Sequence, residues 1–149
     1  MLNIRLAEKD DIEIILKLRL DLIRTLKSSA EYKLSKDFED MTRDYFQSHD
    51  NVTVLAFDND CPVGCATACL VDVMPTYDHP SGKRAHIMNV YVDEKYRRQN
   101  IGNKMIDMII EYIKLWHITN ISLDATSAGR GLYEKFGFTS SEEYMELNL

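Results

Sequence analysis

The sequence predicts an α/β (α+β) fold with a mixed, mostly antiparallel sheet, a central βαβ unit and helices on both faces. Two β-branched or apolar runs, at 52–57 and 63–73, are joined by the turn sequence at 58–60, which is typical of a hairpin. A strongly apolar helical pattern at 105–116 lies between two further strand-like runs, as in the crossover of a βαβ unit. An amphipathic helical pattern near the N-terminus supplies a further helix.

The length and charge of the chain narrow the class of protein. Its 149 residues match one compact domain, and we expect a single domain over residues 1–149. No apolar run approaches the ~20 residues that cross a bilayer, and the N-terminus lacks the layout of a secretory signal. The formal net charge of −6 disfavours nucleic acid and leaves amines as easier partners. We therefore expect a soluble, cytoplasmic protein that binds neither nucleic acid nor membrane.

The N-terminal third predicts a strand and two helices. Residues 3–7 alternate apolar and polar side chains as a strand does, and Asp10 or Asp11 can cap the helix that follows. Arg19 lies inside the apolar stripe of that helix. Either its stem packs on the core with the guanidinium at the rim or paired with a carboxylate, or it points into a substrate cleft. A second helix is predicted over 37–47.

The rest of the chain predicts the hairpin, the βαβ unit and a closing segment. A loop that carries Pro and Gly follows the hairpin, and loops of this kind often shape binding sites. The predicted elements are this loop at 74–83, a strand at 85–93, the apolar helix, a strand at 121–125, a short helix at 129–136, and closing strands near Phe138 and at 144–149.

The three cysteines, Cys61, Cys65 and Cys69, are spaced four residues apart and invite a comparison with metal sites. They lie in a predicted strand, where that spacing separates successive sulfurs by ~13 Å. This is too far for ligands of one zinc ion, each of which lies ~2.3 Å from the metal. We expect no metal, and thiols that are reduced and mostly buried.

A loop at 97–102 joins a predicted strand to the apolar helix. The first turn of a helix presents unpaired N–H groups and a positive dipole end, so such a loop can bind phosphate mainly through its main chain. Asn100 and Gly102 tolerate left-handed backbone angles, while the basic side chains add positive charge. The alternative is an ordinary basic turn. The candidate phosphate-binding residues are Arg97, Arg98, Gln99, Asn100, Ile101, Gly102, Asn103 and Lys104.

On these residues the sequence resembles the GNAT superfamily of N-acetyltransferases, whose acetyl-CoA loop follows the pattern Gln/Arg-x-x-Gly-x-Gly/Ala. Arg97 fills the first position and Gly102 the last, while Asn100 replaces the first glycine. The resemblance covers almost the whole chain and implies acetyl-CoA as co-substrate. It also implies that the strand before the loop, through the backbone of Val90, its neighbour Tyr91 and Val92, contacts the pantetheine arm.

A second family signature, a helical tyrosine followed by Gly-Phe, appears as Tyr133 with Gly137 and Phe138. The resemblance implies that the Tyr133 hydroxyl lies near the cofactor sulfur and protonates the departing thiolate. Many members carry an asparagine seven residues earlier, where this chain has Thr126. The Thr126 hydroxyl could replace one amide contact to the pantetheine or bond the start of the helix instead.

No residue stands out as a dedicated general base for the amine proton. His86 and Asp124 lie on strands that flank the expected cleft, and Asn89 could order a water that relays the amine proton. Strand parity places His86 on one face with Met88, Val90 and Val92, and Asn89 and Tyr91 on the other. The candidate walls of the acceptor pocket are Arg19, Tyr32, Tyr77 and His79.

The predicted function is transfer of an acetyl group from acetyl-CoA to a primary amine in a ternary complex. One alternative is a module that senses acetyl-CoA without turnover, although Tyr133 argues against it. Another is a transferase for a larger acyl-CoA. The acceptor is a small-molecule or peptide amine, and the sequence does not distinguish a polyamine, an antibiotic, an amino acid or a protein N-terminus. Whether the chain forms a homodimer is left open.

Overall fold

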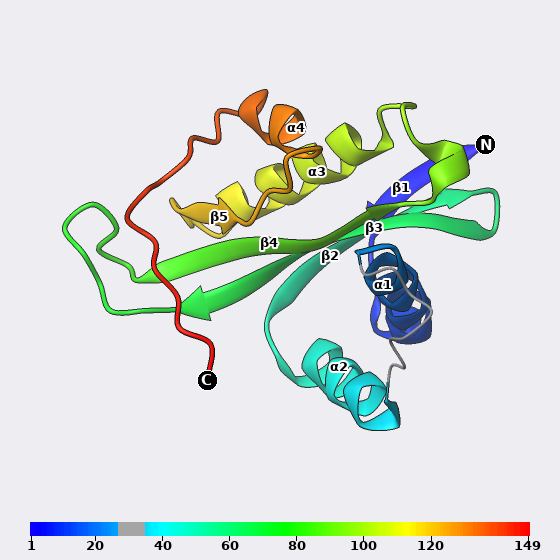
Figure 1. Cartoon of the computed structure of the whole chain (residues 1–149), viewed down its shortest axis with the longest axis horizontal. Helices are drawn as coiled ribbons and strands as arrows, with labels where there is room; N and C mark the ends of the chain where they lie inside the picture. The colour runs from blue at the N-terminus through cyan, green and yellow to red at the C-terminus, as the bar shows by residue number, and fades with distance from the viewer. Residues whose placement is uncertain (27–34) are drawn as a thin grey trace.

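The structure is a computed structural model that describes residues 1–26 and 35–149 (Figure 1). The described residues form one sheet of five strands in the order β1-β2-β3-β4-β5. The first four strands pair antiparallel, and β5 joins β4 in parallel. The predicted fold class is therefore confirmed. The strands are β1 (Leu2–Leu6), β2 (Asn51–Asp58), β3 (Cys61–Asp72), β4 (Lys83–Val92) and β5 (Ile121–Leu123).

Helices lie on both faces of the sheet, with α3 and α4 on one side and α1 and α2 on the other (Figure 1). Helix α3 connects β4 to its parallel neighbour β5, as a βαβ unit requires. Within the described ranges, every helix is too short or too polar to cross a bilayer. The helical elements are η1 (Lys9–Asp11), α1 (Ile12–Leu26), α2 (Lys36–Ser48), η3 (Glu94–Tyr96), α3 (Ile101–Leu115) and α4 (Arg130–Glu134).

The larger core lies between α3 and the sheet. Alanines of the strands face the helix, and their small side chains allow it to approach closely. Each fully buried isoleucine on α3 contributes about 1.5–3 kcal/mol through the hydrophobic effect. The buried side chains of α3 are Ile101, Met105, Ile106, Ile109 and Ile113, and the sheet presents Val54, Ala56, Ala66, Ala68, Ala85 and Ile87 to them.

On the opposite face, α1 packs through Ile15 and Leu18 on Leu55, Phe57 and Cys65 of the sheet. The prediction that Asp10 or Asp11 caps this helix was wrong, because Glu8 is the N-cap of the short helix η1 that leads into α1. The Asp11 carboxylate accepts hydrogen bonds from the Glu8 backbone at 2.7 Å and from the Arg5 guanidinium at 2.7 and 2.9 Å. The guanidinium holds the pKa of Asp11 below its ordinary value.

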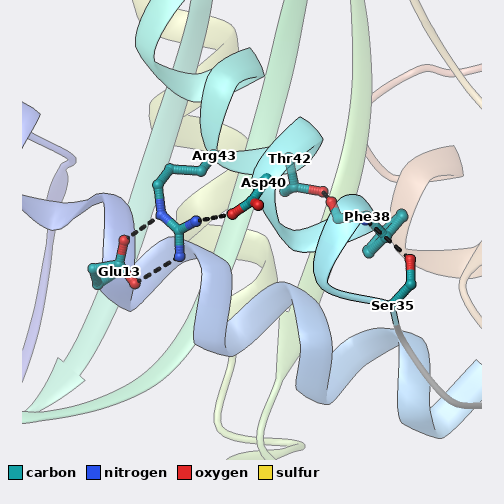
Figure 2. A network of polar contacts seen from close by, with 6 residues as sticks. All are labelled: Glu13, Ser35, Phe38, Asp40, Thr42 and Arg43. Carbon is teal, nitrogen blue, oxygen red and sulfur yellow. Dashed lines mark hydrogen bonds and ion pairs between the residues drawn. The ribbon is translucent and has the colours of Figure 1, made fainter.

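Helix α2 packs Phe46 against the cluster of α1 and also makes polar contacts with α1 at the surface (Figure 2). The Arg43 guanidinium reaches Glu13 of α1 at 2.6 Å and Asp40 of its own helix at 2.9 Å. The Ser35 hydroxyl caps α2 by accepting from the Phe38 N–H at 3.1 Å. Because these groups are exposed, α2 is held less firmly than α3.

The closing strands predicted near Phe138 and at 144–149 are absent from the described chain, and that prediction was wrong. The tail is irregular, with the Tyr144 and Met145 side chains exposed. Alternating side chains produce a strand only when a neighbouring strand accepts its hydrogen bonds. The outer strand β5 has only three residues, so its free edge offers the tail few main-chain partners among the described residues.

Candidate active site

A β-bulge interrupts β4 in its second half. Tyr91 lies opposite Cys65 and Met88 lies opposite Thr67, so β4 carries one residue more than β3 between these pairs. Asn89, inside the bulge, has a φ of 60°, a left-handed angle that asparagine tolerates better than most residues. The bulge therefore re-aims the side chains that follow it.

The prediction that His86 shares a face with Val90 and Val92 was wrong, because the bulge shifts the alternation. Val90 and Val92 pack against the core of α3. Tyr91 packs against the cluster of α1, and the Asn89 side chain also reaches α1. Ala85 and Ile87, the neighbours of His86 in β4, belong to the α3 core. Because side chains alternate along a strand, His86 faces the α1 side of the sheet.

Strands β4 and β5 separate beyond a short paired stretch. Their parallel register covers Ala85↔Ile121, His86↔Ser122 and Ile87↔Leu123, whereas β4 continues to Val92. Beyond Ile87 the β4 backbone has no β5 partner among the described residues. The main-chain groups on that edge can therefore pair with an extended ligand.

Buried polar contacts hold the bulge. Asn89 is 6% exposed, and its side-chain oxygen accepts a hydrogen bond from the Arg19 guanidinium at 3.3 Å. Its side-chain nitrogen donates to the Thr67 hydroxyl at 3.5 Å, and the Cys65 thiol donates to its carbonyl at 3.4 Å. Arg19 thus contacts an amide of β4 while also lying 6.0 Å from the Phe38 ring centroid.

The predicted phosphate loop leads into α3 with two left-handed residues. Asn100, the N-cap of α3, has a φ of 64°, which confirms that it adopts the angle expected for the glycine it replaces. Arg98 has a φ of 63°, which the sequence did not indicate because arginine rarely adopts this angle. The Arg97 Nε donates to the Val92 carbonyl at 3.0 Å and ties the loop to the end of β4.

The first turn of α3 leaves room beside its backbone. A Cβ added to Gly102 would meet Leu132 Cδ2 at 3.8 Å, an ordinary contact distance. The turn carries no acidic side chain among its described residues, and Arg98 and Lys104 are exposed beside it. The Asn103 side-chain nitrogen donates to Asn100. Unpaired N–H groups and basic side chains in this arrangement suit a phosphate.

Tyr133 lies on α4, half-buried against the core of α3. Its ring meets Phe138 edge-on, with centroids 5.9 Å apart. Burial raises the pKa of the Tyr133 hydroxyl. The hydroxyl has no hydrogen-bond partner among residues 1–26 and 35–149, so it can donate to a bound molecule.

An open depression of ≈ 1190 Å³, named here the β4–β5 hollow, extends from α4 past the β4 and β5 edge of the sheet. Tyr133 lies on its α4 wall, His86 and Asp124 on its strand wall, and Tyr144 of the C-terminal segment also lines it. The structure therefore brings the predicted acid and a candidate base to one depression.

His86 is oriented from both ring nitrogens. Its Nδ1 lies 2.8 Å from the Ser122 hydroxyl, and its Nε2 lies 3.5 Å from the Asp124 carboxylate. The Asp124 side chain is 85% exposed, so this contact is weak. Sequence reasoning named His86 and Asp124 but missed Ser122, whose role depends on the β4–β5 register.

The remaining candidates lie elsewhere. The Thr126 hydroxyl accepts from the Gly129 N–H at 3.2 Å and so bonds the start of α4. Tyr77 is 99% exposed, and His79 bonds Thr119 at 2.9 Å; neither lines the β4–β5 hollow. Tyr32 lies outside the described residues.

The cysteines differ in burial: Cys61 is exposed, Cys65 is buried and Cys69 is intermediate. Burial raises the pKa of Cys65 to about 12, so its thiol stays protonated at neutral pH. Across the described ranges, no cluster of three or more His, Cys, Asp or Glu side chains could hold a metal ion.

Comparisons with known proteins show the family of this chain. The acetyltransferase (GNAT) family profile matches residues 20–138. Glucosamine 6-phosphate N-acetyltransferase of Arabidopsis thaliana is 28% identical over 64 residues, 43% of either chain. A Bacillus subtilis protein assigned as an acetyltransferase is 27% identical over 93 residues, 62% of this chain and 56% of that one. The matches thus span about half the length of these relatives.

Solved structures share the fold over the whole chain. An assigned acetyltransferase of Clostridium acetobutylicum, solved with acetyl-CoA, superimposes with a TM-score of 0.89 at 27% identity. The alignment covers 99% of this chain and 96% of that one. Because the family profile covers most of the sequence and includes both the loop and Tyr133, the chain belongs to the GNAT family of acetyltransferases.

Proposed function

We propose that this protein is an N-acetyltransferase that moves the acetyl group of acetyl-CoA directly to a primary amine in a ternary complex. One observation carries the proposal: the left-handed loop before α3 adjoins the β4 edge that β5 leaves unpaired. A phosphate site and an extended main-chain edge thereby lie next to each other. The relative solved with acetyl-CoA, which shares this fold, supports the assignment.

The loop and the β4 edge have different parts in this proposal. Main-chain N–H groups at the start of α3 bind the phosphates, with basic side chains beside them. Main-chain groups of β4 pair with the pantetheine amides. The proposed cofactor-binding residues are Val90, Tyr91, Val92, Arg97, Arg98, Gln99, Asn100, Ile101, Gly102, Asn103 and Lys104.

The chemical step needs a neutral amine, a donor for the oxyanion and an acid for the thiolate. As the amine attacks, a C–N bond forms and the C–S bond breaks. The Val90 N–H stabilises the oxyanion, and Tyr133 protonates the thiolate. His86, oriented by Ser122 and Asp124, accepts the amine proton. Holding both substrates together supplies much of the acceleration.

Asn89 has an indirect part, because its side chain is already bonded to Arg19 and Thr67. It holds the bulge that turns Val90 toward the thioester side of the sheet. Arg19 supports the same geometry from α1. We therefore assign both residues to positioning of the β4 backbone.

The test uses the full chain in two steps. Titration calorimetry with acetyl-CoA measures binding, and an amine library then reports transfer through thiol release and product mass spectrometry. The proposal expects saturable acetyl-CoA binding and at least one product heavier by an acetyl group. Binding without transfer to any amine would indicate a sensor, and absence of binding would overturn the proposal altogether.

A further inference from the structure

Arg84 is an unexplained cation on the wall of the β4–β5 hollow. It precedes His86 by two residues on β4, so both side chains project from the same face, with Cα atoms ~7 Å apart. The aliphatic residues Val71 and Val73 line the hollow beside it. None of the contacts assigned to catalysis or to acetyl-CoA uses this guanidinium.

The Arg84 guanidinium is only partly satisfied. Its Nη2 donates to the Thr76 hydroxyl at 3.3 Å, whereas its buried Nη1 has no hydrogen-bond partner among the described residues. Arg84 also forms no ion pair with a described residue. The nearby carboxylates are already paired, Asp72 with Lys83 at 3.8 Å and Asp124 with His86 at 3.5 Å. A buried N–H without an acceptor destabilises the site unless a ligand supplies one.

The charges follow one another along the wall. Ser122 is the parallel neighbour of His86, and the Asp124 carboxylate, just past the end of β5, lies 3.5 Å from the His86 Nε2. The order is therefore Asp124, His86, Arg84, with carboxylate at one end and guanidinium at the other. This order is complementary to a small molecule that carries an amine at one end and an anion at the other.

From these observations we propose that the acceptor carries an anionic group, a carboxylate or a phosphate, which Arg84 binds while the amine faces His86. The planar guanidinium matches either anion with two parallel hydrogen bonds. The proposal rests on the function proposed above. The acceptor class that this site selects has the size of an amino acid or an amino-sugar phosphate.

The test compares two matched pairs of amines at saturating acetyl-CoA. The pairs are glucosamine 6-phosphate with glucosamine, and L-phenylalanine with L-phenylalaninamide. We expect the anionic member of at least one pair to have a kcat/KM about tenfold or more above its neutral partner. A preference confined to the first pair identifies a phosphate, and one confined to the second identifies a carboxylate.

Arg84→Gln should remove the preference by raising KM for the anionic member, with the neutral member unchanged. Arg84→Lys, which keeps the charge but loses the fork, should retain part of it. Arg130→Gln is the matched control, because Arg130 lines the same hollow but its guanidinium already donates to Ser140 at 2.6 Å. It should keep the full preference.

Two results would overturn the inference: no preference in either pair, or a preference that persists in a folded Arg84→Gln variant. Equal rates of transfer to the anionic and the neutral member of each pair would overturn this inference but leave the proposed acetyl transfer intact. Failure to bind acetyl-CoA, together with no transfer to any of the four amines, would overturn the proposed function as well.

Discussion

The two faces of the sheet are built differently. On one face, α3 buries five described side chains against the strands, and the phosphate loop and Tyr133 adjoin that core. On the other face, α1 contributes to a smaller apolar cluster. In α2, whose residues Lys36–Ser48 are all described, Thr42 is the one buried residue. The geometry of the proposed cofactor site thus depends on deep packing, while α2 is attached by exposed polar contacts and the partly buried Phe46.

This difference suggests a division of tasks. The proposed binding of the thioester and the phosphates of acetyl-CoA needs main-chain groups in fixed positions, which a rigid core supplies. The α1 and α2 side of the sheet can change its surface without disturbing that core. Substitutions on the two faces should therefore differ in their effects on stability and binding.

Truncation of the α3 core should be the most destabilising change. Ile109 is fully buried, so Ile109→Ala should lower the free energy of unfolding by about 2–5 kcal/mol, measured by chemical denaturation. Met41→Ala on α2 is the control, because the Met41 side chain is 72% exposed and should change stability little. Equal losses for the two variants would contradict the comparison of the faces.

Removal of the Tyr133 hydroxyl should impair chemistry and spare the fold. Tyr133→Phe keeps the ring contact with Phe138, and we expect kcat to fall about 100-fold with little change in Kd for acetyl-CoA. Because burial raises the Tyr133 pKa, the hydroxyl stays protonated at neutral pH. A near-wild-type kcat, under conditions where chemistry limits turnover, would show that another group protonates the thiolate.

Stability should fall in alkaline solution through Cys65. Its pKa is about 12 when folded and 9.0 ordinarily, so between these values the unfolded chain binds fewer protons than the folded one. The free energy of unfolding therefore decreases as pH rises above 9, by up to ~1.4 kcal/mol per pH unit from this group.

Cys65→Ala should show a shallower decline over the same range, in urea titrations at successive pH values. Cys61→Ala is the matched control because Cys61 is exposed, and its decline should parallel that of the wild type. Parallel curves for the wild type and Cys65→Ala would contradict the assignment of this pH dependence to the buried thiol.

The smallest effect is expected at the junction of α1 and α2. Arg43→Ala removes the contacts to Glu13 and Asp40, all of them at the surface (Figure 2). We expect a shift in the midpoint of thermal unfolding well below that of Ile109→Ala, and smaller still at high salt. A shift as large as that of the core variant would mean that α2 contributes to a cooperative core.

Sequence patterns predicted the hairpin, the crossover helix and the left-handed Asn100, because turn residues and helical periodicity act locally. They did not predict the bulge at Asn89, since an asparagine within an apolar strand gives no sign that its backbone turns. The Ser122 contact and the position of Arg84 depend on the β4–β5 register, which forms only after the crossover packs. The tail resembled strands locally, yet a regular strand there required a longer neighbouring edge than the three residues of β5 provide.

The central claim is that the turn at the start of α3 binds the phosphates of CoA. A Cβ at Gly102 makes only an ordinary contact with Leu132 at 3.8 Å, and one at Gly131 meets nothing within 4 Å, so Gly102→Val and Gly131→Val form a matched pair. By calorimetry with CoA, we predict a Kd at least about tenfold weaker for folded Gly102→Val, because the branched side chain stands where the phosphate approaches the backbone. Gly131→Val should bind as the wild type does. Unchanged affinity in folded Gly102→Val would contradict the account.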